Sequence, residues 1–284
     1  MHNALIIGIG EILWDMLPQG RQLGGAPANF AYHVSKLGMQ GVVVSAIGND
    51  ALGDEIMSFL EDKNLDLHLM RVENPTGVVN IELNDVGIPM YNIVENVAWD
   101  SIPFTSELEV LAQNTKAVCF GSLAQRNEVS RNTIRRFIES LPQQCLKVFD
   151  VNLRQQYYSR EIIEWSMTHC DVLKLNDEEI VELKRIWAME EITDASFCAE
   201  LQRRYDIKII ILTCGAVGSY VYSKDGAVSF QETPTVDVVD TVGAGDSFTA
   251  AFVVSLLNGD TITEAHSKAT AVAAATCTHS GAMY

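Results

Sequence analysis

Residues 240–246 read DTVGAGD and run directly into SFTAAFVV at 247–254. Two glycines flank a small residue and a carboxylate opens an apolar helical run, so this stretch predicts a backbone turn that feeds a helix N-terminus. The free amides of such a turn and the helix dipole bind negative oxygen. With Asp246 beside it, the site suits phosphoryl transfer, in which the amides stabilise the moving group and the aspartate takes a hydroxyl proton. An ordinary glycine turn with a favourably placed acid is the alternative.

The composition is that of a folded, acidic protein. The 284 residues, 48% of them hydrophobic, can bury a large core, and no repeat, low-complexity tract or proline- and serine-rich linker divides them. We therefore expect one domain over residues 1–284. The formal net charge of −17 argues against nucleic acid or an anionic membrane as a partner. An anionic substrate would need a local nest of amides.

The cysteines and the N-terminal residues bear on location. The six cysteines are widely spaced with no CxxC pair, which favours neither a zinc site nor a disulfide framework and fits a reducing compartment. The first residues lack the basic region and apolar length of a signal peptide, and no stretch of 18 apolar residues occurs. We expect a cytoplasmic protein.

The N-terminal part of the sequence contains residues that we expect to contact a ligand. A buried strand is expected at 5–9, and the extended segment after it carries Asp15 toward residue 18. The run GGAPAN at 24–29 then opens a helix, and its paired glycines let the backbone approach whatever occupies the turn. Asn29 offers both a donor and an acceptor there. An ordinary loop and helix start would explain the same residues.

A hairpin is expected to stand apart from the main sheet. After a second buried strand at 42–47 and a helix at 51–63, residues 78–83 and 90–95 flank NDVGIP, which is typical of a β-hairpin. Its period of two differs from the continuous apolar run of a parallel core strand, so we expect a partly exposed flap. Exposed apolar flap residues need a partner, which is a closed active site, a second subunit or both.

From residue 116 onward, short apolar strands alternate with helices. The strands are expected at 117–120, 146–150, 172–175 and 207–213, and the helices near 129–140, 160–169, 177–189 and 194–205. Such alternation predicts a parallel sheet with helices on both faces, where ligands bind at the carboxyl ends of strands. Polar residues and glycines follow those ends: Asp150, Asn152, Arg154, Asn176, Glu179, Thr213, Gly215 and Gly218. The pair Asn176 and Glu179 is equally explained as a capping box.

The C-terminal part is expected to hold a hairpin at 220–231 and two helices, one to about residue 257 and an alanine-rich one over 262–276. The stripe of Ala265, Ala269, Val272 and Ala273 favours packing on the preceding helix, with a flat ligand such as adenine as the alternative. The sequence holds no GxxxxGK[ST], GxGxxG, HExxH or GxSxG, and its histidines are too dispersed to suggest a metal cluster. Phosphoryl transfer at residues 240–246 therefore needs the fewest assumptions.

Six motifs in order make the chain resemble the ribokinase-like carbohydrate kinase family, particularly its fructokinase branch. GGAPANFA at 24–31 is similar to the family's N-terminal signature, and DTVGAGD at 240–246 to its C-terminal signature. Weaker matches are Gly10-Glu11 with Asp15, DVNLR at 150–154, NDEE at 176–179 and TCGAVG at 213–218. The likeness spans essentially the whole chain.

The resemblance implies a fold and a reaction. The fold is an α/β, three-layer αβα ribokinase-like domain with a mainly parallel central sheet and a small β-sheet lid, here residues about 11–18 and 76–97. In the family the lid covers the sugar and often forms the dimer interface, so we expect a homodimer through the lid. The reaction is transfer of the γ-phosphoryl group of ATP, with Mg²⁺, to the primary hydroxyl of a small sugar, most simply D-fructose.

The resemblance also implies roles for named residues. Asp246 would be the base, and Gly243, Ala244 and Gly245 the anion hole. The sugar site would comprise Asp15, Gly24, Gly25, Asn29 and Arg154, the last meeting either the sugar or the γ-phosphate. The nucleotide site would comprise Asn176, Thr213, Gly215, Gly218 and Gly245, and Glu179 would hold Mg²⁺ through water.

Many relatives bind a monovalent cation beside the anion hole. The matching positions here are Asp240 and Val242, with the carbonyls of Thr276, His279 and Gly281. The pattern departs from that of ribokinase, because the sequence reaches Tyr284 just short of the position that supplies a further side-chain ligand there. The resemblance thus implies ATP and Mg²⁺ as cofactors, with potassium as a further candidate.

Alternatives to fructose exist within and outside the kinase class. A kinase for 2-keto-3-deoxygluconate, ribose or a nucleoside would use the same Asp15 and Asn29, since both serve any polyol. The alternative of another class is a non-catalytic sugar-binding regulator on the same fold. An intact Asp246 beside two glycines counts against it, because a binder has no use for a base next to an anion hole.

Overall fold

The computed structural model describes residues 5–17, 20–83 and 89–284. Within them, the strands of the main sheet are β1 (Leu5–Ile9), β4 (Gln40–Gly48), β5 (Asp66–Val72), β8 (Thr115–Gly121), β9 (Leu146–Asp150), β10 (Val172–Asn176), β11 (Ile209–Thr213), β12 (Gly218–Ser223) and β13 (Val228–Glu232). Their order is β13-β12-β11-β10-β9-β8-β1-β4-β5. All pairs from β5 to β11 are parallel, whereas β12 and β13 pair antiparallel at one edge. The predicted mainly parallel sheet is confirmed.

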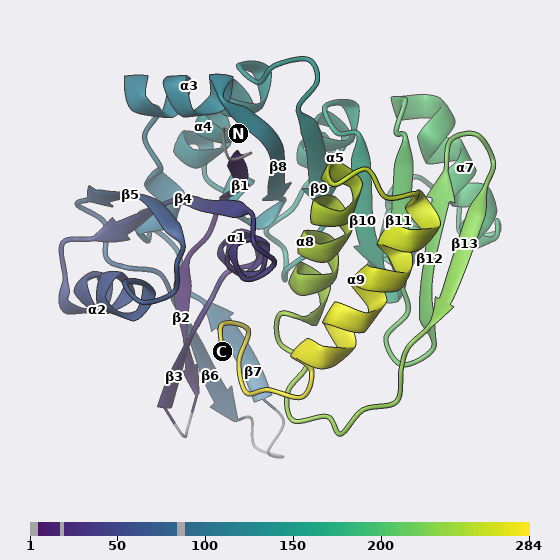
Figure 1. The fold of residues 1–284 in the computed structure, drawn as a ribbon. Coiled ribbons are helices and arrows are strands. Elements are labelled where there is room, and N and C mark those ends of the chain that lie inside the picture. The colour runs from purple at the N-terminus through teal and green to yellow at the C-terminus, as the bar shows by residue number, and fades with distance from the viewer. Residues whose placement is uncertain (1–4, 18–19, 84–88) are drawn as a thin grey trace.

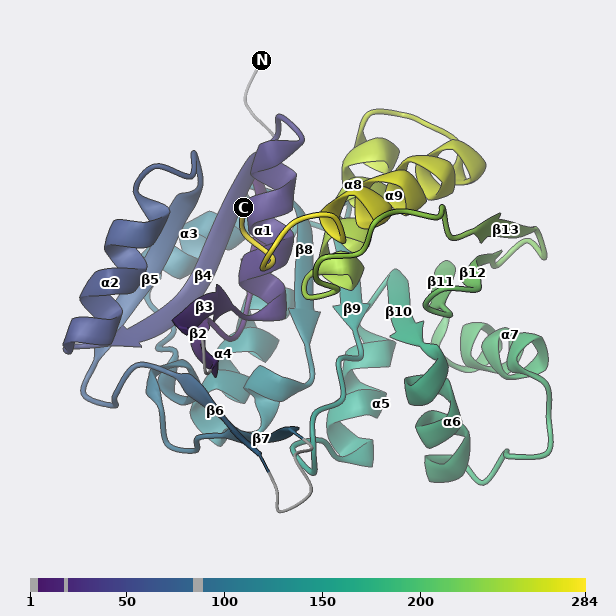
Figure 2. The ribbon, with the colours of Figure 1, turned by 90° about the horizontal axis from the view of Figure 1, so that it is seen from below.

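Helices cover both faces of this sheet, as Figure 2 shows. One face carries α1 (Ala26–Lys36), α2 (Ala51–Leu60), α8 (Ala244–Leu257) and α9 (Ile262–Thr276), and the other carries α3 (Ser106–Gln113), α4 (Glu128–Glu139), α5 (Arg160–Thr168), α6 (Asp177–Ile186) and α7 (Asp194–Tyr205). Two short 3-10 turns, η1 (Ala98–Ser101) and η2 (Leu123–Gln125), complete the layer of α4. The three-layer αβα fold expected from the sequence is therefore present.

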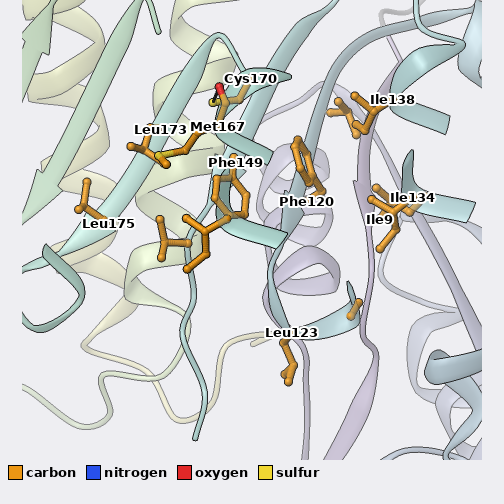
Figure 3. Close-up of a cluster of buried hydrophobic side chains, with 14 of the residues drawn as sticks. Ile9, Phe120, Leu123, Ile134, Ile138, Phe149, Met167, Cys170, Leu173 and Leu175 are labelled. Atoms are coloured by element: carbon orange, nitrogen blue, oxygen red, sulfur yellow. Dashed lines mark hydrogen bonds between the residues drawn. The ribbon is translucent and has the colours of Figure 1, made fainter. Parts of the chain in front are cut away.

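Alternate residues of each strand feed two cores, because side chains of a strand point to opposite faces in turn. Ile9, Phe120 and Leu173 pack toward α3–α7, whereas Ile6 packs toward α1 and α8. The rings of Phe120 and Phe149 stack with centroids 5.4 Å apart in the first core (Figure 3). Each such fully buried side chain contributes about 1.5–3 kcal/mol relative to exposure. The sheet is thus a rigid platform for the residues at its strand ends.

A second, smaller sheet lies beyond the carboxyl ends of the parallel strands (Figure 1). It contains β2 (Leu13–Leu17), β3 (Gly20–Gly24), β6 (Val78–Leu83) and β7 (Pro89–Ile93) in the order β3-β2-β6-β7. The predicted hairpin is confirmed by the antiparallel pairing of β6 with β7, and it stands outside the main sheet. The predicted turn at 84–89 falls largely on residues 84–88, which lie outside the described residues.

Two strands and one α-helix were missing from the prediction, as were the two 3-10 turns. β3 and β5 are edge strands of their sheets, and their sequences, GRQLG and DLHLMRV, interrupt apolar residues with polar ones. Pairing with β2 and β4 stabilises them, and no local signal reports that pairing. The helix α3 spans only 8 residues and starts at a Thr105 cap. The small sheet therefore gains a strand that the predicted lid segments did not contain.

Neither a disulfide bond nor a membrane-spanning helix occurs among the residues that the structure describes. All six cysteines lie within the described ranges and are free thiols. None of the helices among residues 5–17, 20–83 and 89–284 combines the length and apolar character needed to cross a bilayer.

Candidate active site

The turn at the start of α8 has the geometry that the sequence predicts. Gly243 is the N-cap residue and lies in the left-handed region, at φ 78° and ψ −1°, which favours glycine. The amide of Ala244 donates to the carbonyl of Thr241 at 3.2 Å, and that of Ser247 donates to the carbonyl of Gly243 at 2.8 Å. The amides between them, those of Gly245 and Asp246, belong to the first helical turn, where backbone amides have no hydrogen-bond partners within the helix. They are the donors available to an anion.

A cleft of about 1240 Å³ runs from the small sheet to the carboxyl ends of β10 and β11. It is larger than the usual range for one small ligand, so two substrates have room. Its walls include most of the predicted site residues: Asp15, Gly24, Gly25, Asn29, Arg154, Asn176, Glu179, Thr213, Gly215, Gly218, Val242, Gly243, Ala244, Gly245 and Asp246. The fold thus brings both signatures and the strand-end motifs to one cavity.

Asn29 and Asp246 join the two signatures directly. The side-chain amide of Asn29 donates to Oδ2 of Asp246 at 2.8 Å, although the residues are 217 positions apart. Asn29 is almost fully buried, and its Oδ1 accepts no hydrogen bond from any described residue. The amide therefore orients the carboxylate of Asp246 and leaves one acceptor beside it for a hydroxyl group.

The environment of Asp246 gives its carboxyl group the pKa of a useful base. Burial and the nearby carboxylate of Asp150 together raise the pKa to about 6, against the lowering effects of Lys174, the hydrogen bond from Asn29 and Arg154. A general base works best when its pKa lies near the operating pH. Asp246 is thus mostly ionised at neutral pH and still basic enough to accept a proton.

Two further carboxyl groups, those of Glu11 and Asp15, line the same cleft. Burial raises the pKa of Glu11 to about 7 and that of Asp15 to about 6, and the charge of Arg154 opposes both increases. Oε1 of Glu11 accepts from the side-chain amide of Asn152 at 3.3 Å, whereas Oε2 has no partner among the described residues. The sequence indicated Glu11 only as part of a motif. Its burial under residues 24–26 is a tertiary property.

We expect Glu11→Gln to stabilise the protein in a pH-dependent manner. A carboxyl group whose pKa is raised in the folded state binds more protons there than in the unfolded state, so it lowers stability as the pH rises from about 4.5 to about 7. The variant should exceed the wild type in unfolding free energy by about 1–3 kcal/mol at pH 8 and by much less at pH 4.5. Urea denaturation at both pH values measures this. An equal difference at the two values would contradict the buried charge.

The end of the cleft that is predicted to bind a nucleotide begins at the cap of α6. Oδ1 of Asn176 accepts from the amide of Glu179, and Oε2 of Glu179 accepts from the amide of Asn176, both at 2.8 Å. Oε1 of Glu179 accepts from the amide of Leu153 at 2.9 Å. The capping box is therefore present, and the same two residues line the cleft. Since both oxygens of Glu179 already bind amides, a contact to Mg²⁺ through water fits better than direct coordination.

The described residues offer no group of three or more histidine, cysteine, aspartate or glutamate side chains arranged for a metal ion. In proteins that bind phosphate-containing substrates, Mg²⁺ commonly keeps several waters and is held by one or two carboxylates together with the substrate phosphates. Glu179 therefore fits an ion that arrives with the nucleotide and supplies charge to its phosphates. That role stays a prediction.

Thr213, Gly215 and Gly218 surround the turn between β11 and β12. The amide of Cys214 donates to the carbonyl of Gly218 at 2.8 Å, and the hydroxyl of Thr233 donates to the carbonyl of Gly215 at 2.6 Å. These bonds shape the rim of the cleft opposite α9. The alanine stripe of α9 divides, because Ala265 and Ala269 are in the core whereas Ala273 lines the cleft. Core packing is therefore confirmed for Ala265 and Ala269, whereas contact of Ala273 with a flat ligand stays a prediction.

Of the five residues proposed for a monovalent cation, Val242 lines the cleft and the other four do not. Oδ1 of Asp240 accepts from the amide of Val242 at 3.0 Å, and Oδ2 accepts from the amide of Gly281 at 2.9 Å. The carbonyl of Thr276 accepts from the amide of His279 at 3.1 Å. Asp240 therefore clamps the turn to the C-terminal loop. Potassium binding at these five residues stays a prediction.

Lys174 is a residue of the cleft wall that the sequence analysis missed. The available signal was a charged residue inside the otherwise apolar strand VLKLN at 172–176. Such a residue is costly to bury unless it is paired.

A turn with free amides beside an oriented carboxylate, at the carboxyl ends of a parallel sheet, is the arrangement expected of a kinase that phosphorylates a hydroxyl group. Comparison with protein families narrows this class. The chain belongs to the family described as pfkB family carbohydrate kinase, whose model matches residues 19–284. It is an ATP-dependent sugar kinase, and so a phosphotransferase acting on an alcohol group.

Curated and solved relatives agree with this assignment. The chain is similar to the ATP-dependent 6-phosphofructokinase of Thermoanaerobacterium thermosaccharolyticum, at 27% identity over 302 residues that cover 98% of this chain and 89% of the relative. It is similar to the fructokinase of Salmonella typhimurium, at 28% identity over 269 residues that cover 89% and 85%. A crystal structure of an uncharacterized sugar kinase from Pyrococcus horikoshii in complex with ATP superimposes with a TM-score of 0.82 at 27% identity, covering 98% and 94%.

Proposed function

We propose that this kinase phosphorylates the primary hydroxyl of a small neutral sugar, D-fructose before others. The observation that carries this proposal is the acidic acceptor end of the cleft. Glu11, Asp15 and Asp246 lie close enough to Arg154 for its charge to act on all three. A phosphate or carboxylate on the substrate would face these acids, whereas sugar hydroxyls can donate to them.

In the proposed reaction, the side chain of Asp246 removes the proton of the sugar hydroxyl as its oxygen attacks the γ-phosphorus of ATP. The bond to the β,γ-bridging oxygen breaks, and its electron pair leaves with ADP. The first-turn amides near Gly243 and Gly245 hold the charge on the transferring group. Asn29 keeps the carboxylate of Asp246 aimed, and Glu179 would hold Mg²⁺ through water, where the ion supplies positive charge to the phosphates.

A sugar acid such as 2-keto-3-deoxygluconate is the second candidate, and Arg154 favours it. The guanidinium group of Arg154 is exposed at the cleft wall and forms no ion pair with any residue that the structure describes. Such a group is free to meet a carboxylate, or the γ-phosphate of ATP. A sugar phosphate would use the same group, as suggested by the similarity to a 6-phosphofructokinase.

A panel of acceptors should separate these substrates. We expect ADP release, measured by a coupled assay, to show a kcat/KM for fructose at least about tenfold above those for ribose, 2-keto-3-deoxygluconate, fructose 6-phosphate and adenosine. Arg154→Met should change the fructose value little if the arginine serves an anionic substrate, and reduce it if the arginine meets the γ-phosphate. A preference for the sugar acid or the sugar phosphate would overturn the neutral-sugar proposal. Normal ATP binding without turnover on any acceptor would favour the regulator.

We further propose a cytoplasmic homodimer that pairs through the small sheet. The free thiols of all six cysteines support a reducing compartment. β3 and β7 are the edge strands of the small sheet, and such edges are ready to pair with another chain.

A further inference from the structure

Lys174 is a charged residue within a buried strand. It lies on β10 between Leu173 and Leu175, and only 8% of its surface is exposed. Because alternate residues of β10 point to opposite faces, Lys174 shares a face with Val172, which packs toward α8. A lysine buried in this way is tolerated when a carboxylate pairs with it.

Asp150 supplies that pair from the neighbouring strand. It faces Lys174 directly in the parallel register of β9 and β10. The ammonium nitrogen lies 3.1 Å from Oδ1 and 3.0 Å from Oδ2 of Asp150. An ammonium group has three N–H donors, and one carboxylate cannot use all of them well. Lys174 is therefore fixed in position with a donor to spare.

The spare donor lies beside the anion-binding turn. A Cβ atom built on Gly245 would lie 3.0 Å from Nζ and 3.6 Å from Cε of Lys174, so the ammonium group packs against the backbone of that residue. Lys174, Gly245 and Asp246 all line the same cleft. The absence of a side chain at position 245 leaves the way open between the ammonium group and an anion held by the turn.

The charges around Lys174 keep it protonated. Burial by itself would lower the pKa of the ammonium group, but Asp150, Glu179 and Asp246 outweigh burial and raise it above its ordinary range. In return, Lys174 lowers the pKa of Asp246 against the effects of burial and of Asp150. A permanent positive charge thus lies between the base and the nucleotide end of the cleft.

We propose that Lys174 is a further catalytic residue, whose ammonium group, held by Asp150, donates to an oxygen of the γ-phosphoryl group during transfer. This proposal rests on the proposed function. The new bond joins the sugar oxygen to the γ-phosphorus, the bond to the β,γ-bridging oxygen breaks, and the hydroxyl proton goes to Asp246. Lys174 keeps its proton throughout. It stabilises the charge on the transferring group in a site with little water, where one such donor contributes about 10²–10³-fold.

A purely structural ion pair is the competing account, and a second buried lysine provides the control. Lys184 is 9% exposed and donates to Oδ1 of Asp194 and to the carbonyl of Ile192, at 2.6 and 2.7 Å. It lies on α6 and does not line the cleft. Lys184→Met removes a similar pair without touching the proposed site, so it reports the cost of losing a buried ammonium group alone.

The decisive variants are Lys174→Met and the double variant Lys174→Met with Asp150→Asn, which avoids an orphaned carboxylate if the single variant fails to fold. We expect both to lower kcat by about 10²–10³-fold, with KM for sugar and ATP within about threefold. Lys184→Met should retain kcat within about twofold. In Lys174→Met, the pH below which kcat falls should be higher than in the wild type, because the positive charge that favours the ionised form of Asp246 is lost. A folded double variant with near-normal kcat would overturn the proposal.

A binding measurement separates this proposal from the choice of substrate. Calorimetry with ADP plus aluminium fluoride, a mimic of the transferring phosphoryl group, requires no turnover. Relative to wild type, the double variant should bind this mixture at least about tenfold more weakly while binding ADP alone normally. An equal affinity for the mixture would overturn the role of Lys174, even if fructose is the substrate. A wild type that phosphorylates no sugar but shows the tenfold difference would overturn only the proposed function.

Discussion

Replacing Asp246 with asparagine should lower kcat by about 10²–10⁴-fold while sugar and ATP bind nearly normally. The variant removes the carboxylate that accepts the hydroxyl proton in the proposed reaction. The amide oxygen of the new asparagine can still accept the hydrogen bond from Asn29, which is 2.8 Å long in the wild type. The turn and the cleft should therefore keep their shape. Steady-state kinetics of ADP release, with binding of both substrates by calorimetry, measure the two effects separately.

Asp260→Asn is a matched control at the opposite end of α8, where the carboxylate of Asp260 binds Lys268 and Ser255 outside the cleft. It should leave kcat unchanged. In the wild type, kcat should fall as the pH drops below about 6, because the pKa of Asp246 is about 6 and only its ionised form accepts a proton. If the asparagine variant retained most of its turnover, Asp246 would not be the base.

Gly243→Ala should be the second severe change, with a loss of about 10²-fold or more in kcat. The φ of 78° disfavours any residue with a side chain, and a Cβ at this position would collide with the Cβ of Ala282 and lie 3.0 Å from its Cα. Relief requires the turn or the C-terminal loop to move, and a displacement of about 1 Å in a catalytic group can cost about 10²-fold. Turnover and thermal unfolding of the purified variant measure the two consequences.

Two variants isolate the cause of that loss. Gly259→Ala places an alanine at φ 90° at the other end of α8, where no atom lies within 4 Å of the new Cβ, so it should cost stability without affecting kcat. Adding Ala282→Gly to Gly243→Ala removes the colliding methyl group and should restore part of the activity. A Gly243→Ala variant with wild-type kcat would show that the turn tolerates displacement and does not position the transferring group.

Much of the fold could be predicted because its signals are local. The bounds of β1, β9 and α9 match the predicted ranges, since short, mostly apolar stretches mark the two strands and an alanine-rich stretch marks the helix. The turn before α8 was predicted for the same reason, from its two glycines. β3 and β5 were not, because an edge strand of mixed polarity forms through its partner strand and has no pattern of its own.

The sequence by itself determined which chemical groups are available: a glycine turn, one aspartate after it, a second glycine pair with Asn29, and acids at strand ends. Only the tertiary structure decided how they act together. Packing of α1 beside α8 brings Asn29 into hydrogen-bond contact with Asp246. The register of β9 with β10 pairs Asp150 with Lys174. The raised pKa values of Glu11 and Asp246 arise there too, because desolvation and neighbouring charges come from elements far apart in the chain.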